Sequence, residues 1–383
     1  MFRNIRGRAV GGKVRKLARK LKSDRILFTA TLLLVCLSVV MVYSASAPMA
    51  LERYGKATMF LIKQGAWALL GLTLLWLVMR IDYRAYREPV FIWTCVGLVA
   101  IALVAVLFSP PVNNARRWFG IAGVGVQPSE LAKLAAIFFI AALLERRMHR
   151  VNELSYALLP IAIVVVMLVG LILLEPDFGT SMSLLLIAAV MVFAAGLDYR
   201  YIAGAALCAA PAVYVLVMST SYRRQRVLTF LDPWRDPLGA GFQIIQSLIA
   251  VGTGGLWGKG LMQGVQKLFY LPEPHTDFIY AVIAEELGLV GATAVLLCFS
   301  VVTWRGLRIA LRAPDTFGAF LALGLTTMVA VQAFINVSVV LGLMPTKGIP
   351  LPFVSNGGSS LVINLIGMGI LLNVSQHASS AEA

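Results

Sequence analysis

Long apolar runs recur along the whole chain and limit the folds it can adopt. A run of about twenty residues with few charges can cross the hydrocarbon core of a bilayer, which is about 30 Å thick. Hydrophobic residues make up 59% of the 383 residues and charged residues only 13%, against about 45–50% and about 25% in soluble domains. An alternating porin-type pattern is absent, so we predict an all-α integral membrane protein.

We predict about ten transmembrane helices, which form a membrane domain over residues 26–376. Residues 1–25 precede it as a basic tail, and residues 377–383 follow it as a short tail. A long loop at about 219–275 separates the seventh and eighth helices. Its apolar, glycine-rich middle is too short to span and fits a re-entrant or interfacial segment. The predicted spans are about 26–45, 58–79, 89–108, 128–144, 154–174, 180–197, 201–218, 276–302, 318–341 and 358–376.

The distribution of Lys and Arg predicts the orientation. Ten of these residues lie in residues 1–25, and ten more lie in linkers that an even number of spans places on the same side. The positive-inside rule makes this side cytoplasmic, with both termini inside and the loops 109–127 and 219–275 outside. Topology and contact with anionic membrane lipids account for the net charge of +15, so we do not predict nucleic-acid binding.

The stretch "LPEPHTDFIYAVIAEELG", Leu271 to Gly288, carries the most distinctive polar residues. His275, Thr276 and Asp277 stand at the outer mouth of the eighth predicted span. Thr276 or Asp277 could cap the helix. Asp277 could equally be a partly desolvated carboxylate whose raised pKa suits a general base. The two interpretations are compatible.

Glu285 and Glu286 lie deeper in the same span, where ionisable groups are costly. We favour a supporting role for these residues, in which Glu285 or Glu286 is bonded to a basic or polar group on a neighbouring span. Direct participation in chemistry is the less favoured alternative.

Basic residues on the outer side form a second set of candidates. They depart from the positive-inside bias in regions that also carry tryptophans. Snorkelling at the lipid interface is one explanation. A site for a lipid-linked phosphate or pyrophosphate is the other, because arginine forks bind phosphate in bidentate fashion. The candidates are Arg116, Arg117, Trp118, Arg223, Arg224, Arg226 and Lys267.

Two further outer motifs carry candidate residues. In "MPTKGIPLPFVSNGGSSL", Ser355 and Ser359 with the Gly357–Gly358 amides could form an anion-binding nest, although a tight start to the last helix is favoured. In "LEPDFGT", Glu175 and Asp177 are supporting candidates, and Asp177 could simply cap a helix. No nucleotide-binding loop or catalytic Ser-His-Asp set is present, so the energy for any reaction must come from the substrate.

These stretches together resemble the SEDS family of bacterial cell-wall polymerases, which includes FtsW, RodA and SpoVE. Within the family the chain is most similar to the division branch. It departs from the family pattern at Asn356, where the family has Tyr, and at Ala284, where the family has Gly. The matching stretches are "MVYSAS", "ARRW…QPSELAKL", "LEPDFGTS", "DPWRDPLGAGFQIIQSLIAVGTGGLWGKGL", "LPEPHTDFIYAVIAEELG" and "PTKGIPLPFVSNGGSSL".

The resemblance implies a peptidoglycan glycosyltransferase that polymerises lipid II, an undecaprenyl-pyrophosphate disaccharide-pentapeptide, on the outer face of the cytoplasmic membrane at the septum. Asp277 matches the family's essential aspartate. It is expected to take the proton from the acceptor 4-hydroxyl as this attacks the donor's anomeric carbon with inversion. Undecaprenyl pyrophosphate leaves, and arginines or a divalent cation such as Mg²⁺ or Mn²⁺ neutralise its charge.

The resemblance also implies partners: a cognate class B penicillin-binding protein, which is a transpeptidase, and other divisome membrane proteins. Two alternative functions stay open. One is a RodA-like elongation polymerase, and the other is a lipid II flippase. A transporter would place polar groups near the membrane midplane on paired broken helices, whereas the unusual residues of this chain gather on the outer side.

Overall fold

The computed structural model describes residues 23–381 except 112–114, 122–123, 220 and 347. Within this range it leaves undescribed the side chains of 121, 124, 202, 212, 216, 221–223 and 379–381. Nearly all of the predicted basic tail, 1–25, therefore lies outside the described residues. The end of the predicted C-terminal tail, 382–383, lies outside them as well.

Helices dominate the described chain, which confirms the predicted all-α class. The α-helices are α1 (Arg25–Tyr54), α2 (Met59–Val78), α3 (Pro89–Val106), α4 (Pro128–Arg147), α5 (Leu159–Leu174), α6 (Phe178–Ala194), α7 (Tyr199–Met218), α8 (Ser221–Leu231), α9 (Phe242–Gly254), α10 (Ile279–Arg312), α11 (Thr316–Val340) and α12 (Gly358–Ala381). Shorter helical turns are η1 (Tyr83–Arg87), η2 (Met148–Arg150), η3 (Leu154–Leu158) and η4 (Pro233–Arg235).

A small hairpin within the loop 109–127 was not predicted. Its strands are β1 (Phe119–Ile121) and β2 (Val124–Val126), which pair antiparallel with Phe119 opposite Val126. The strands are three residues each, so the period-2 pattern is too short to stand out in the sequence.

Each of the ten predicted spans overlaps a helix, in the order α1–α7 and α10–α12. By length and hydropathy, seven segments of the described chain could cross a membrane: α1, α2, α3, 154–174, α10, α11 and α12. Of the others, α6 has only 17 residues, and α4 contains Glu130 and Lys133. The multi-span membrane fold is thus established, while the count of ten and the position of the long loop stay predictions.

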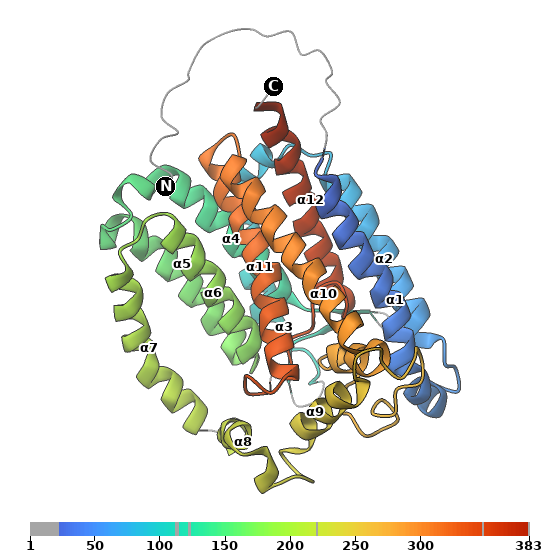
Figure 1. Cartoon of the computed structure of the whole chain (residues 1–383). Helices are drawn as coiled ribbons and strands as arrows, with labels where there is room; N and C mark the ends of the chain where they lie inside the picture. The colour runs from blue at the N-terminus through green and yellow to red at the C-terminus, as the bar shows by residue number, and fades with distance from the viewer. Residues whose placement is uncertain (1–22, 112–114, 122–123, 220, 347, 382–383) are drawn as a thin grey trace.

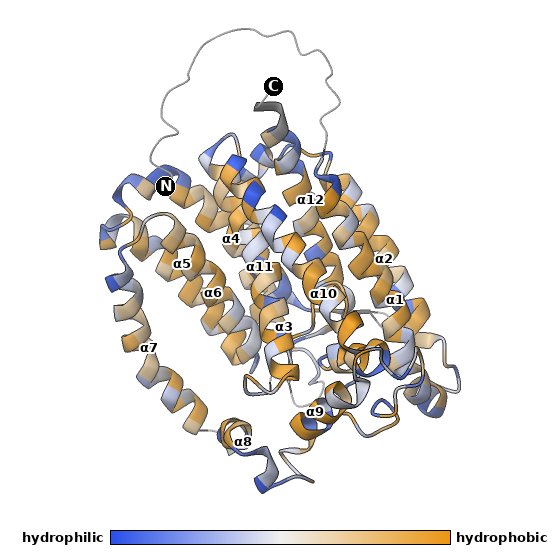
Figure 2. Cartoon of the chain, in the orientation of Figure 1, coloured by the Kyte–Doolittle hydropathy of each residue, from blue (hydrophilic) through white to orange (hydrophobic). Residues whose placement is uncertain are grey.

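The centre of the bundle is formed by α11 and α12. Their apolar windows are 78% and 89% buried, against 22% for α2 and 28% for α3. Figure 1 shows α11 and α12 flanked by the other long helices, while α7 and α8 diverge from the bundle. The outer helices turn apolar side chains outward, with Leu69 70% and Ile101 66% exposed, and Figure 2 shows hydrophilic residues mainly at the helix ends. Exposed apolar surface of this extent fits a lipid surround.

The described ends of the chain meet at one end of the bundle. The Asp24 amide donates to the Ser375 Oγ at 3.1 Å, which joins the start of α1 to the last turns of α12. The Arg305 guanidinium near the end of α10 also bonds the Asp24 carboxylate, with Nε 2.7 Å from Oδ2. The start of α10 lies at the opposite end, which the sequence predicts to be the outer face.

Helix α10 is broken at Gly288, and the backbone of the preceding loop fills the break. Gly288 has φ 67° and ψ −167°, a conformation that only glycine adopts without strain. The Leu289 and Val290 amides donate to the Gly255 and Leu256 carbonyls at 2.8 and 3.2 Å. In the other direction, the Glu285 and Glu286 carbonyls accept from the amides of residues 259 and 260, both at 3.0 Å. The loop therefore satisfies the backbone groups that the break frees.

Close approach of α9 to α10 requires glycine at position 254, which gives a first prediction. A Cβ on Gly254 would lie 1.9 Å from the Ala284 carbonyl oxygen. We expect Gly254→Ala to cost about 1–3 kcal/mol or more, as overpacking does. Gly252, in the same helix, has open space around its Cβ position, so Gly252→Ala is the matched control and should be neutral or slightly stabilising. Thermal unfolding in detergent measures both, and equal effects would contradict the packing argument.

Candidate functional site

Asp277 lies in the turn just before α10, and it does not cap that helix. The cap residue of α10 is Phe278, and no side chain bonds the first free amides. The Thr276 hydroxyl contacts Glu273 instead, 3.1 Å from Oε2. The capping interpretation of Thr276 and Asp277 is therefore wrong, because the chain turns one residue too late for either side chain to reach these amides.

The backbone of this turn is held by three polar contacts. The Asn336 side chain on α11 donates to the Asp277 carbonyl and to the Ile349 carbonyl, both at 2.8 Å. The Ser355 hydroxyl donates to the Thr276 carbonyl, and the Asn356 amide donates to the His275 carbonyl at 2.9 Å. Together they attach the turn to α11 and to the loop 349–356. The position of Asp277 is thus fixed without using its carboxylate.

The Asp277 carboxylate accepts no hydrogen bond from the residues that the structure describes. Burial raises its pKa to about 7, and the nearby charges of Glu273 and Asp177 also raise it, whereas those of Arg226 and Arg117 lower it. Gly348 leaves little room beside it, since a Cβ there would lie 2.9 Å from Oδ2. An unengaged carboxylate with a pKa near neutrality can accept a proton from a substrate hydroxyl.

Arg117 belongs to the loop between α3 and α4 and is held against the connection between α5 and α6, from where its charge acts on Asp277. Its guanidinium donates to the Glu175 carbonyl at 3.0 Å and to the Pro176 carbonyl. Glu175 itself is fully buried, and neither of its carboxyl oxygens has a hydrogen-bond partner in the described chain. Burial, with the charge of Asp177, raises the pKa of Glu175 to about 8. Glu175 is therefore mainly protonated at neutral pH.

Asp177 is the N-cap of α6. Its carboxylate accepts from the Thr180 amide at 3.2 Å and from the Thr180 hydroxyl at 2.7 Å. The Gln127 side chain, next to the start of α4, donates to the same carboxylate at 2.9 Å. Asp177 thus joins α4 to α6 and contributes negative charge to the surroundings of Asp277.

Arg226 approaches Asp277 from α8. Its guanidinium donates to the Thr346 carbonyl at 2.8 Å, and its charge lowers the pKa of Asp277. Arg224 is exposed on the same helix. The side chain of Arg223 lies outside the described residues. Of the two arginines in this segment whose side chains the structure describes, Arg226 is the one whose charge acts on Asp277.

The other outer candidates lie in different surroundings. The Arg116 guanidinium donates to the Leu107 carbonyl at the end of α3 at 2.8 Å. Trp118 packs beside Gly125 of the hairpin. His275 is buried with its ring 4.9 Å from that of Phe60, and burial lowers its pKa. The neutral form of the buried His275 ring is thus favoured.

Lys267 does not lie on a surface open to a substrate. Its Nζ is 2.6 Å from Glu286 Oε1, and both side chains are at least 97% buried. Glu286 also accepts from the Ser44 hydroxyl of α1 and from the Met262 amide at 3.0 Å. Lys267 and Glu286 therefore hold the outer loop against α1 and α10, which differs from the substrate-binding role predicted for Lys267.

Glu285 forms a second anchor for the same loop. It bonds the Lys259 Nζ at 2.7 Å and accepts from the Val265 and Gln266 amides. We predicted that Glu285 or Glu286 bonds a polar group on a neighbouring span, and Glu286 does so through Ser44 of α1. The partners of Glu285 come from the loop 255–271, which folds back along α10.

Of the two glycines at the start of α12, Gly358 allows close packing against α2. A Cβ on Gly358 would lie 2.2 Å from the Trp67 ring of α2. Neither Gly357 nor Gly358 has a positive φ, so the alternating backbone of an anion nest is not formed. Ser359 is buried with its hydroxyl unpartnered among the described residues. The structure thus agrees with the favoured interpretation, a tightly packed helix start, and not with the nest.

The described residues contain no group of three His, Cys, Asp or Glu side chains arranged to hold a metal ion. Near Asp277, the Asp177 carboxylate is engaged by Thr180 and Gln127. Among the described residues, Arg117 and Arg226 are the positive charges that act on Asp277.

Comparisons with known sequences and structures find relatives of one protein family. A family model described as cell cycle protein, for FtsW, RodA and SpoVE, matches residues 24–380. The probable peptidoglycan glycosyltransferase FtsW of Geobacter sulfurreducens is 43% identical, over 94% of this chain and 96% of that protein. A solved structure described as structural coordination of polymerization and crosslinking by a peptidoglycan synthase complex is 31% identical with a TM-score of 0.77, over 94% and 99% of the two chains. The rod shape determining protein RodA of Thermus thermophilus is 29% identical with a TM-score of 0.70, over 93% and 97%.

Proposed function

Because the chain belongs to the cell cycle protein family of FtsW, RodA and SpoVE, we propose that it is a peptidoglycan glycosyltransferase that polymerises lipid II, with Asp277 as the general base. The observation that carries this proposal is the Asp277 carboxylate itself. It is unengaged, its pKa is about 7, and two arginine charges act on it at the predicted outer end of the bundle.

The reaction joins two lipid-linked sugars outside the membrane. Asp277 takes the proton of the acceptor 4-hydroxyl, whose oxygen attacks the anomeric carbon of the donor. The bond from that carbon to the pyrophosphate oxygen breaks, and undecaprenyl pyrophosphate leaves with the bonding electrons. Arg117 and Arg226 are the groups that would stabilise the charge developing on the pyrophosphate. The donor arrives activated, so the site needs no nucleotide.

The proposal places the protein in the cytoplasmic membrane at the division septum, with both termini in the cytoplasm. The greater identity to FtsW (43%) than to the RodA structure (29%) supports division over elongation. The similar synthase complex, which coordinates polymerization and crosslinking, supports a crosslinking partner, and we propose a class B penicillin-binding protein. Other divisome membrane proteins are further contacts in this proposal. Paired broken helices would favour a flippase. Among the described residues, α10 is the one helix interrupted by non-helical backbone, and a loop of the same chain fills its break. This arrangement gives the flippase no support.

The direct test is glycan synthesis from purified lipid II in detergent, with and without the partner transpeptidase. Glycan strands are the expected product, detected by gel separation of labelled chains. Absence of strands even with the partner, together with movement of labelled lipid II across vesicles by the same protein, would replace the polymerase by the flippase.

The pKa of Asp277 gives a prediction for the pH profile. A general base must be deprotonated, so kcat/KM should rise with pH through about 7 and level off above it. Arg226 lowers the pKa of Asp277. Arg226→Ala should therefore raise that pKa and move the rising limb to higher pH, so that the loss of activity is larger at pH 6.5 than at pH 8.5. Arg224→Ala, two residues away and exposed, is the control whose limb should stay in place.

A further inference from the structure

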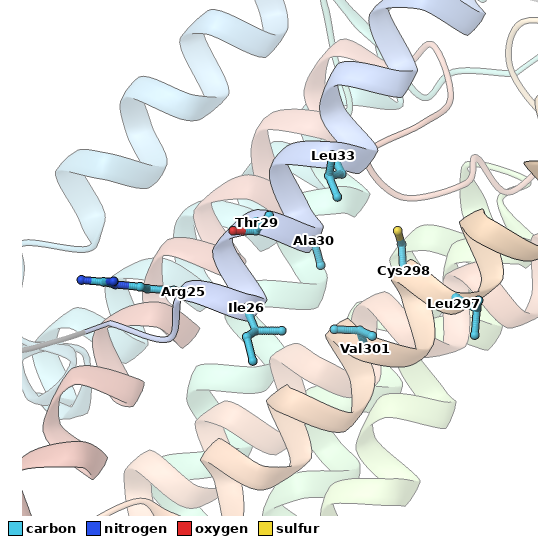
Figure 3. A pocket seen from close by; sticks show the side chains of 8 residues that line it. All are labelled: Arg25, Ile26, Thr29, Ala30, Leu33, Leu297, Cys298 and Val301. Carbon is cyan, nitrogen blue, oxygen red and sulfur yellow. The ribbon is translucent and has the colours of Figure 1, made fainter.

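We propose that a groove between α1 and α10, at the end of the bundle opposite Asp277, binds an anionic phospholipid of the cytoplasmic leaflet. The groove has a volume of about 390 Å³. Figure 3 shows it from close by, with Ile26 of α1 and Val301 of α10 pointing toward one another. Its apolar part is lined by Ile26, Thr29 and Leu33 of α1 and by Leu297, Cys298 and Val301 of α10.

A second hollow of about 370 Å³ continues the groove to the end of the bundle. It shares Arg25 and Ile26 with the first, and α10 contributes Arg305, Arg308 and Arg312. Asp24 is the carboxylate among its lining residues. Among the lining residues guanidinium groups outnumber carboxylates, which suits an anion.

Two of these arginines are available for an anion. The Asp24 carboxylate already accepts hydrogen bonds from the Arg305 guanidinium and from the Leu27 amide, the latter at 3.0 Å. Among the described residues, the guanidinium groups of Arg25 and Arg308 form no hydrogen bond and no ion pair, and Arg308 lies 5.9 Å from the Trp304 ring centre. Guanidinium forks match the geometry of phosphate oxygens. The guanidinium groups of Arg25 and Arg308 at this mouth can therefore bind the oxygens of a phosphodiester.

The order of the two parts along the helices matches a lipid. On α10 the lining residues recur at helical spacing from Leu297 to Arg312 and thus form one stripe. This stripe is apolar within the membrane and basic at its end. The proposed topology puts this end at the cytoplasmic leaflet, where anionic lipids gather. A free phosphate would use the arginines alone, whereas a phospholipid fills both hollows, with its headgroup at Arg308 and an acyl chain beside Thr29.

Native mass spectrometry of the full chain in detergent tests this inference. Phosphatidylglycerol and phosphatidylcholine with identical acyl chains are the probes, and phosphatidylglycerol is expected to give the more persistent adduct. Arg308→Gln should weaken phosphatidylglycerol binding about fivefold, as expected for one basic residue at an anionic surface. The matched control is Arg80→Gln, since Arg80 also lies near a tryptophan, 3.5 Å from the Trp76 ring centre. Equal binding of the two lipids, or equal effects of the two variants, would overturn the site.

A second variant distinguishes a bound lipid from a free phosphate or a protein partner in the groove. Thr29 is exposed in the groove, so Thr29→Trp should fill the apolar part and reduce the phosphatidylglycerol adduct while leaving the thermal midpoint without lipid unchanged. Glycerol phosphate is the headgroup-only probe. Its binding as tightly as the lipid, with no effect of Thr29→Trp, would assign the site to a free phosphate. Displacement of the lipid by the partner transpeptidase would assign the groove to a protein. Adduct mass is read without glycan synthesis, so failure here is distinct from failure of the proposed function.

Discussion

Asp277→Asn is expected to slow glycan polymerisation by about 10²–10⁴-fold, the contribution typical of a positioned general base. The amide cannot take the proton of the acceptor hydroxyl. The fold should survive, because the Asp277 carboxylate accepts no hydrogen bond from the described residues, whereas Asn336 holds its carbonyl. The rate of strand formation from purified lipid II, with the partner transpeptidase present, measures the loss. The thermal midpoint in detergent checks the fold.

Glu273→Gln is the matched control for this loss. Glu273 is an exposed carboxylate four residues earlier, and its charge raises the pKa of Asp277. Removing that charge should lower the pKa of Asp277, so the variant should keep its rate above pH 8 and gain relative activity below pH 7. Near-normal synthesis by Asp277→Asn, or an equal loss in both variants, would remove Asp277 as the base.

The helical membrane architecture could be predicted because long apolar segments leave few other folds in a bilayer. The break in α10 could not. Gly288 stands in an apolar run where a glycine is a weak signal, and the break exists only because the backbone at Gly255 and Leu256 satisfies the freed amides. Helix boundaries were also missed: α1 continues through Pro48 to Tyr54, past the predicted end at residue 45.

The site could be predicted in part, for a related reason. Asp277 was recognised because it stands where a polar, proline-rich run meets an apolar one. Which arginines accompany it depends on loops whose path the sequence does not give, so Arg226 could not be separated from Arg224. Asn336, which fixes the turn, was missed. In the sequence, Gln332 and Asn336 are two polar residues four positions apart within an apolar segment. This spacing places them on one face of the helix and could have indicated a polar contact inside the bundle, where both are buried.

Breaking the buried pair of Lys267 and Glu286 should give a large loss of stability. Glu286→Gln leaves the Lys267 ammonium, whose side chain is 3% exposed, without its counter-charge. Lys267→Met leaves the Glu286 carboxylate with only Ser44 and the Met262 amide. Each change alone should lower the free energy of unfolding by about 3–5 kcal/mol, as removal of one partner of a buried ion pair does. Denaturant titration in mixed micelles measures it.

The double variant Glu286→Gln/Lys267→Met decides whether that loss belongs to the pair. Removing both charges leaves no uncompensated ion, so the double variant should be more stable than either single variant, and strictly additive losses would show that the two residues act independently. Glu153→Gln, which breaks the exposed pair with Arg150, should cost at most about 1 kcal/mol. Because the loop held by Lys267 leads directly into the turn of Asp277, the single variants should also lose polymerisation. Their kcat/KM should still rise with pH over the same range as in the wild type. A displaced base slows the reaction but keeps the neighbouring charges that set its pKa.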